Sequence, residues 1–202
     1  EELKKEIPLF VAGQIAYHTN FVREFLSPYA LDLTSFPHYL KQFHDMGIKS
    51  EYFRIGFEAT VLKKLKKSKA RYDVSFVGGF SKHHLKSYEL MEWLVARTPV
   101  EFWGYGYNSL SSGSLVKKNY HGEAWGIDMY QILFNSKISL NRHGEVAENY
   151  ANNMRMYEAT GVGSMLITDY KDNLGDLFVL GKEVETYKNK EELLAKIKYY
   201  LS

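Results

Sequence analysis

The chain has 202 residues, of which 45% are hydrophobic and 25% are charged, and its formal net charge is +2. This composition supports a folded core and excludes a disordered chain, and the nearly balanced charge argues against a nucleic-acid partner. There is no cysteine, which excludes disulfides and thiolate metal sites, and no apolar run approaches the ~18 residues of a membrane span. Because the first residues do not resemble a signal peptide, we expect a cytoplasmic protein.

Residues 1–62 are predicted to be the end of an N-terminal α/β domain. The elements expected in it are strands at 7–12, 31–35 and 51–55 and a helix at 37–47. A lysine-rich run follows, and we interpret residues 63–72 as a basic linker. A solvated linker or helix face is one interpretation of this run. The alternative is a peripheral contact with a membrane or a phosphate-rich acceptor.

From residue 73 onward, strands and helices alternate regularly. The strands expected there are 73–78, 100–103, 137–140, 164–168 and 183–187, and the helices are 81–96, 126–135, 153–160, 172–180 and 189–201. Asn189 and Glu192 predict a capping box at the start of the last helix. Five βα units in series predict an α/β domain over residues 73–202, with a Rossmann-like parallel sheet covered by helices on both faces.

The most informative segment is the short helix that begins at Asn153. An asparagine at a helix start leaves backbone N–H groups pointing outward, which makes a natural anion site. Five residues later, the carboxylate of Glu158 is able to accept hydrogen bonds from vicinal hydroxyls. Together they predict a site for a nucleotide diphosphate. The alternative for Glu158 is a surface ion pair with Arg155, three residues earlier.

A glycine turn joins the strand at 73–78 to the next helix. Gly78 and Gly79 allow phosphates to approach the backbone, and Lys82 and His84 are candidate cations beside them. The turn is not a P-loop, because it lacks the Gly-Lys-Ser/Thr sequence. The alternative is an ordinary tight turn with exposed polar side chains.

Two further segments follow predicted strands and carry polar residues. The loop at 120–126 contains Gly122, and such loops commonly line a ligand crevice at the carboxyl ends of parallel strands. The cluster at 141–145 begins with Asn141 and includes Arg142 and His143. Ordinary hydrated connections are the alternative for both segments. The Gly-Tyr-Gly at 104–106 is only a weak match to a dinucleotide fingerprint.

No motif in the sequence predicts a metal site or a cofactor. His-Glu-x-x-His and Asp-x-Asp are both missing, and so is the Gly-x-Ser-x-Gly elbow of one large class of hydrolases.

The blocks at 74–79, 120–126, 136–141, 153–161, 166–169 and 181–184 together closely resemble the CgeB-like group of glycosyltransferases. This group belongs to the group 1 superfamily with the GT-B fold, and the resemblance covers about residues 30–202. It implies two facing Rossmann-like domains, with the nucleotide-sugar donor held by the C-terminal one, residues 73–202. Residues 1–62 then end the acceptor-side domain. The biological setting implied is glycosylation of a cell-surface polysaccharide or a spore coat.

The resemblance also implies roles for individual residues. Glu158 matches a glutamate that binds the donor ribose, while Tyr150 stands where relatives often carry another glutamate. The residues assigned to nucleotide-sugar binding are Gly78, Gly79, Gly122, Asn141, Asn153, Tyr157 and Glu158. Arg155, Lys82 and His84 are assigned to catalysis, because preoriented cations stabilise the charge that develops on a diphosphate leaving group.

We therefore expect a metal-independent glycosyltransferase that takes a nucleotide-sugar donor and a sugar, lipid or protein acceptor. Two alternatives keep the fold: a nucleotide-sugar-binding or assembly module without transfer activity, and a nucleotide-sugar epimerase. The sequence does not identify the base, the sugar, the acceptor or the residue that activates the acceptor.

Overall fold

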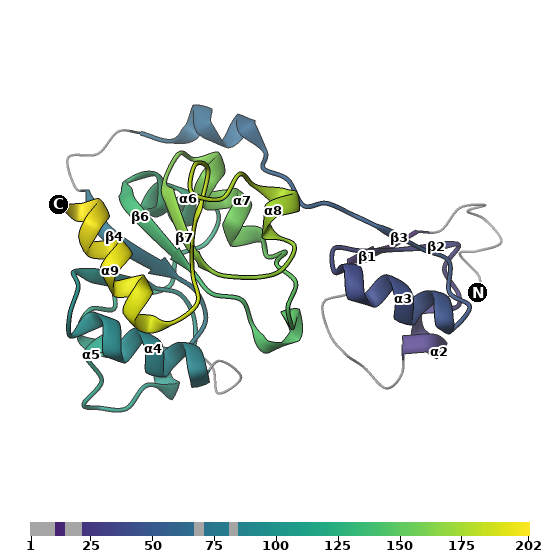
Figure 1. Cartoon of the computed structure of the whole chain (residues 1–202), viewed down its shortest axis with the longest axis horizontal. Helices are drawn as coiled ribbons and strands as arrows, with labels where there is room; N and C mark the ends of the chain where they lie inside the picture. The colour runs from purple at the N-terminus through teal and green to yellow at the C-terminus, as the bar shows by residue number, and fades with distance from the viewer. Residues whose placement is uncertain (1–10, 15–21, 67–70, 81–84) are drawn as a thin grey trace.

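The computed structural model describes residues 11–14, 22–66, 71–80 and 85–202, and their strands form two separate parallel sheets (Figure 1). The smaller sheet has the order β1-β2-β3, and the larger has the order β5-β4-β6-β7-β8. The strands are β1 (Val11–Gln14), β2 (Leu31–Thr34), β3 (Ser50–Tyr52), β4 (Tyr72–Val77), β5 (Val100–Trp103), β6 (Ser136–Asn141), β7 (Met165–Asp169) and β8 (Glu185–Tyr187).

Helices connect the strands in both sheets. The α-helices are α2 (Val22–Leu26), α3 (Pro37–Asp45), α4 (Leu85–Val95), α5 (Leu115–Lys118), α6 (Gly126–Phe134), α7 (Met154–Gly161), α8 (Leu174–Leu177) and α9 (Lys190–Leu201). The short 3₁₀ helices within the described ranges are η1 (Ala59–Lys64), η3 (Tyr107–Ser109) and η4 (Glu145–Ala147). The predicted α/β class with a parallel sheet is confirmed.

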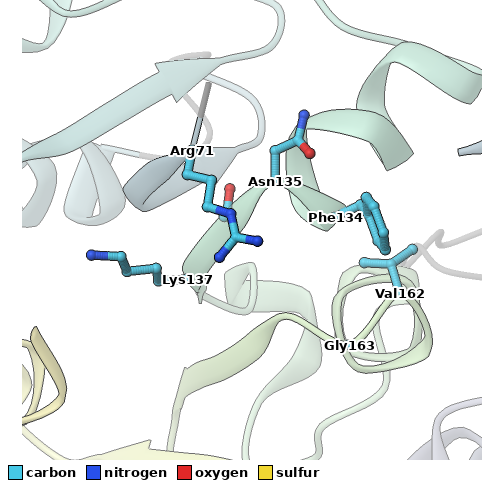
Figure 2. Close-up of a pocket in the computed structure, with 7 residues that line it drawn as sticks. Arg71, Phe134, Asn135, Lys137, Val162 and Gly163 are labelled. Carbon is cyan, nitrogen blue, oxygen red and sulfur yellow. The ribbon is translucent and has the colours of Figure 1, made fainter. Parts of the chain in front are cut away.

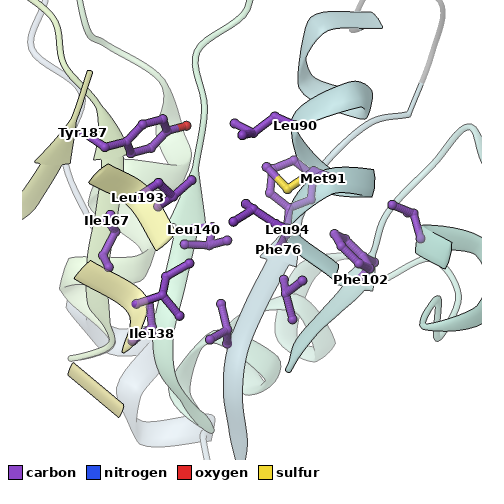
Figure 3. Packing of buried hydrophobic residues seen from close by; sticks show 14 of the residues in the cluster. Phe76, Leu90, Met91, Leu94, Phe102, Ile138, Leu140, Ile167, Tyr187 and Leu193 are labelled. Atoms are coloured by element: carbon purple, nitrogen blue, oxygen red, sulfur yellow. The ribbon is translucent and has the colours of Figure 1, made fainter. Parts of the chain in front are cut away.

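The larger sheet is buried on both faces. One face packs against α4, α5 and α9, and Figure 3 shows the centre of this layer. The side chains labelled there are Phe76, Leu90, Met91, Leu94, Phe102, Ile138, Leu140, Ile167, Tyr187 and Leu193. The other face packs against α6, α7 and α8 through a second cluster that includes Leu133, Met156, Leu166 and Leu174. Each fully buried side chain of this size stabilises the fold by roughly 1.5–3 kcal/mol, so both layers contribute to the stability of the folded domain.

Several expected elements differ in extent from the structure or lie partly outside the described residues. The helix expected at 172–180 is shorter, because Phe178 has an extended backbone after α8. The strand expected at 51–55 ends at Tyr52, after which the chain leaves the small sheet. In the helix expected at 81–96, residues 81–84 lie outside the described residues. The domain limits at 62 and 72 stay a prediction; η1 spans the first of them.

A short helix that the periodicity did not predict, α5, depends on a contact from a distant residue. Ser114 caps it by accepting a hydrogen bond from the N–H of Lys117 (2.9 Å). The carboxylate of Glu92 on α4 accepts a second one from the N–H of Leu115 (3.0 Å). Because a residue more than twenty positions earlier supplies half of the cap, local sequence patterns do not reveal this helix.

The loop between β6 and α7 contacts the smaller sheet and its helices. Ala147 belongs to the cluster that includes Phe36 and Phe43, and the Tyr150 ring stacks on His38 with centroids 5.0 Å apart. The side-chain amide of Asn152 donates to the backbone oxygen of Ser35. The same loop therefore reaches from the larger sheet to the smaller one.

The middle strand of the smaller sheet contains a fully buried carboxyl group, Asp32. Neither of its oxygens has a hydrogen-bond partner within the described ranges, and the hydroxyl of Ser50, its neighbour across the β2–β3 pair, has none there either. Burial raises the pKa of Asp32 from 3.8 to about 6. The ionised form therefore destabilises the folded state.

Asp32→Asn tests this cost. The folded-state pKa lies above the unfolded value, so the destabilisation grows as the pH rises through about 4 to about 6 and persists above. The substitution should stabilise the protein at about pH 8 by up to about 3 kcal/mol, and much less near pH 4. Thermal unfolding at both pH values measures this. Asp45→Asn, which removes one partner of the exposed Lys41–Asp45 ion pair, is the control. An equal increase in stability for Asp32→Asn at both pH values contradicts the interpretation.

Candidate functional site

A cavity of about 250 Å³ lies at the carboxyl ends of β4 and β6. After β4 the chain crosses to β5 on one side, and it then returns to β6 on the other side of β4. Connections diverge at such a switch point and leave a crevice, which is where doubly wound sheets bind ligands. The cavity is lined by Phe76, Val77, Gly78, Gly79, Tyr105, Leu140, Asn141, Arg142, Gly144, Asn153 and Arg155.

The glycine turn of the cavity is packed very closely against the turn after β5. Gly104 has a φ of 130°, and a Cβ added to it would lie 1.9 Å from the oxygen of Gly78. A Cβ on Gly79 would lie 2.5 Å from the ring of Tyr105. Gly78 and Gly79 thus pack closely against the turn after β5 in addition to lining the cavity.

The start of α7 forms another wall, and its first turn has no side-chain cap. Asn153 occupies the N-cap position, but its amide nitrogen donates to Oδ1 of Asn141 (2.8 Å) and not to the helix. Asn141 in turn donates to the hydroxyl of Thr168 (2.9 Å). The N–H of Met156 donates to the backbone oxygen of Asn153 (3.3 Å), and no side chain caps the first turn, so its N–H groups favour an anion.

Arg155 is held at the cavity by two hydrogen bonds. Its Nε donates to the backbone oxygen of Val77 (3.1 Å), and its Nη1 donates to Oε2 of Glu158 (2.8 Å). Burial lowers the pKa of Arg155, and the charge of Glu158 opposes that effect. An arginine stays protonated under ordinary conditions, so the cavity wall carries a fixed cation.

Glu158 does not line the cavity, although it was predicted to bind ribose there. Glu158 is 8% exposed, and its carboxylate forms an ion pair with Arg155. Burial raises the pKa of Glu158, while Arg155 acts in the opposite direction. The ion pair with Arg155 is present, although it is largely buried and not on the surface as the alternative supposed, and the ribose contact stays a prediction.

Other predicted residues lie around the cavity without lining it. Tyr157 donates its hydroxyl to Asn152 (3.2 Å) and packs against Phe178, and burial raises its pKa to about 12. Gly122 accepts a backbone hydrogen bond from Gly104 (3.1 Å), which fixes the 120–126 loop to the turn after β5. Lys82 and His84 lie outside the described residues.

Among the lining residues to which the sequence assigned no role, Arg142 and Tyr105 bring groups that are able to contact a ligand. Arg142 follows the strand β6, in the polar cluster at 141–145, and brings a second cation. Tyr105 stacks on the exposed ring of Trp125, with centroids 6.0 Å apart, and places an aromatic face at the cavity. The signal for Arg142 was its place directly after a buried strand, whereas nothing local distinguished Tyr105.

The loop that carries Arg142 is anchored by its neighbour, His143. Oδ1 of Asp169 accepts hydrogen bonds from the backbone N–H (2.9 Å) and from Nδ1 (2.7 Å) of His143. Burial raises the pKa of Asp169, but the hydrogen bonds of His143 and the charge of Lys171 outweigh it, so the pKa lies below its usual value. The ionised carboxylate clamps the loop to the end of β7.

A second cavity, of about 270 Å³, lies at the opposite edge of the same sheet (Figure 2). It is lined by Arg71, Phe134, Asn135, Ser136, Lys137, Val162 and Gly163, at the amino ends of β4, β6 and β7. Lys137 is already paired with Asp73 (2.6 Å). Size alone would favour this cavity, but ligands of such sheets bind at the carboxyl ends of the strands, so we assign the site to the switch point.

Among the residues that the structure describes, no three His, Asp or Glu side chains gather as a metal site requires. No helix there combines the length and the apolar character needed to cross a membrane.

The fold is that of the GT-B glycosyltransferases. It is shared with a structure described as "Trehalose-6-phosphate from E. coli bound with UDP-2-fluoro glucose", at 11% identity and a TM-score of 0.59 over 91% of this chain. It is shared also with an "alpha-glucosyltransferase in complex with UDP-glucose and DNA containing an abasic site", at 9% identity and a TM-score of 0.58 over 95% of this chain. The chain spans 55% and 63% of the lengths of these two proteins.

The sequence model of the family described as "Glycosyl transferase-like" matches residues 84–202, and the chain belongs to this family. A search of curated proteins gave no match.

Thr168→Val tests the hydrogen-bonded chain from β7 to the start of α7. Valine keeps the shape but leaves the buried amide of Asn141 without an acceptor, so we expect a loss of roughly 1–3 kcal/mol in the free energy of unfolding. Thr168→Ser keeps the hydroxyl and should retain most of the stability. Denaturant unfolding compares them, and equal losses for both variants would argue against the hydrogen bond.

Gly104→Ala tests the close packing of the two turns. The new methyl group clashes with the oxygen of Gly78 in a backbone conformation that alanine disfavours, so we expect a loss of roughly 2–4 kcal/mol. Gly113→Ala is the matched control, since nothing lies within 4 Å of a Cβ there. Similar melting temperatures for the two variants would contradict the packing argument.

Proposed function

We propose that this chain is the donor-side part of a metal-independent glycosyltransferase that takes its sugar from a nucleoside diphosphate sugar. One observation carries the proposal: the uncapped start of α7, Arg155 and Arg142 meet in one cavity at the switch point. Helix N–H groups and arginines are the donors that phosphate groups prefer. The ligands named for the two solved structures, UDP-2-fluoro glucose and UDP-glucose, support the same class of donor.

The proposed chemistry follows from where charge develops. The bond between the anomeric carbon and the diphosphate oxygen breaks, and its electron pair stays on that oxygen. The acceptor hydroxyl oxygen bonds to the carbon, and its proton passes to the diphosphate leaving group or to solvent. Positive groups placed beforehand around the diphosphate stabilise this charge more in the transition state than in the ground state. Arg155 and the α7 amides have this role in our proposal, with Arg142 beside them.

The remaining assignments extend the proposal to the whole protein. We propose that residues 73–202 bind the donor, that 1–62 end the acceptor-side domain, and that the chain belongs to the CgeB-like group. Lys82 and His84 are proposed as further cations at the glycine turn. The acceptor is a sugar, lipid or protein that the other domain would bind.

A thermal-shift titration of the 202-residue chain tests donor binding. Saturating UDP or another nucleoside diphosphate, at about 100 times its Kd, should stabilise the fold by about 2.7 kcal/mol. Arg155→Met should reduce the affinity at least tenfold, because it removes a charged donor from the cavity wall.

Arg97→Met is the control for this titration. Arg97 lies over the Trp93 ring at the end of α4 and does not line the cavity, so its loss should leave the affinity unchanged. If no nucleoside diphosphate or its sugar shifts the melting temperature, the proposed function fails. Sugar transfer by a longer protein that contains both domains would separate a transferase from a binding module or an epimerase.

A further inference from the structure

The pairing of Arg155 with Glu158 leaves part of the guanidinium unused. An arginine has five N–H donors in a planar fork. Nε is directed to Val77 and Nη1 to Glu158, while Nη2 has no hydrogen-bond partner among the described residues. Arg155 lines the cavity and Glu158 does not. The carboxylate thus contacts the guanidinium without itself lining the cavity.

This arrangement has an electrostatic consequence for an anionic ligand. A bare carboxylate next to a diphosphate would repel it, and in partly buried surroundings such repulsion is weakly screened. The ion pair neutralises the carboxylate, and the two fixed bonds restrict the rotamers of Arg155. The side chains of Arg155 and Glu158 are only 17% and 11% exposed, so solvent competes little with the pair.

We infer that Glu158 is a positioning residue, which holds the Arg155 guanidinium at the cavity wall for the diphosphate of the donor. The inference rests on the proposed function, because it assumes that the cavity binds a diphosphate. It differs from the predicted role of Glu158 as a direct ligand of ribose. The two roles make opposite predictions for a ligand that has phosphates but no ribose.

Isothermal titration of the 202-residue chain with pyrophosphate and with UDP separates the two roles. If Glu158 acts through Arg155, Glu158→Gln weakens both ligands by the same factor, about tenfold, since both lose the same oriented donor. If Glu158 binds ribose, Glu158→Gln weakens UDP alone. Pyrophosphate binding that is unchanged or tighter in Glu158→Gln overturns the inference.

Double mutants exclude a merely structural effect. In an Arg155→Met background, Glu158→Gln should cause no further loss of pyrophosphate affinity, because its target is gone. In the matched Arg142→Met background, the full tenfold loss should remain, because Arg142 lines the same cavity without a bond to Glu158. An equal loss in both backgrounds indicates general disruption of the site and overturns the inference.

Arg155→Lys keeps the test decisive if Glu158→Gln does not fold. Lysine keeps the charge but lacks the fork that serves Val77, Glu158 and a ligand together. We expect it to weaken pyrophosphate binding about tenfold, and unchanged affinity overturns the inference.

If the wild-type chain binds neither UDP nor pyrophosphate, the proposed function fails and the inference with it. If it binds both and Glu158→Gln loses only UDP, the inference alone fails.

Discussion

The reversal in strand order at β4 is the constraint on which the site depends. The sheet grows from β4 to β5 on one side and from β4 to β6 to β7 on the other, so two connections leave the same edge in opposite directions. The crevice between them has to be walled by loops. The glycine turn after β4 forms one wall, and the segment from Asn141 to α7 forms the other. The first wall is fixed by close packing against the turn after β5 and the second by buried polar contacts, which explains how loops line a defined cavity.

Asn141 shows how these contacts work together. Its amide joins Thr168 on the neighbouring strand to Asn153 at the start of α7. Because Asn153 bonds to Asn141, it leaves the first turn of its own helix uncapped. Asparagine at this position usually caps its own helix, but Asn153 instead ties the start of α7 to Asn141. The start of α7 therefore lies at the cavity that Arg142 and Arg155 also line. The site thus combines backbone dipoles with two side-chain charges.

The sequence predicted the larger sheet well, because its signals are local. These signals are the short apolar runs of the strands, the glycines that end elements and the Asn189 cap of α9, and each acts within a few residues. The cap is observed, with Oδ1 of Asn189 accepting from the N–H of Glu192 at 2.9 Å. Features that depend on distant residues escaped prediction. The cap of α5 comes in part from Glu92, and the ring on which Tyr105 stacks comes from another loop. Spacing placed Glu158 near the site but did not say which way its carboxylate points.

The loop from Arg142 to Asn152 belongs to two structural units at once. Its first residues line the cavity of the larger sheet, while Ala147, Tyr150 and Asn152 are attached to the smaller sheet and its helices. A wall shared in this way is a mechanical linkage. Tilting one sheet against the other would move Arg142 relative to the opposite wall of the cavity, so the shape of the cavity and the angle between the sheets are coupled.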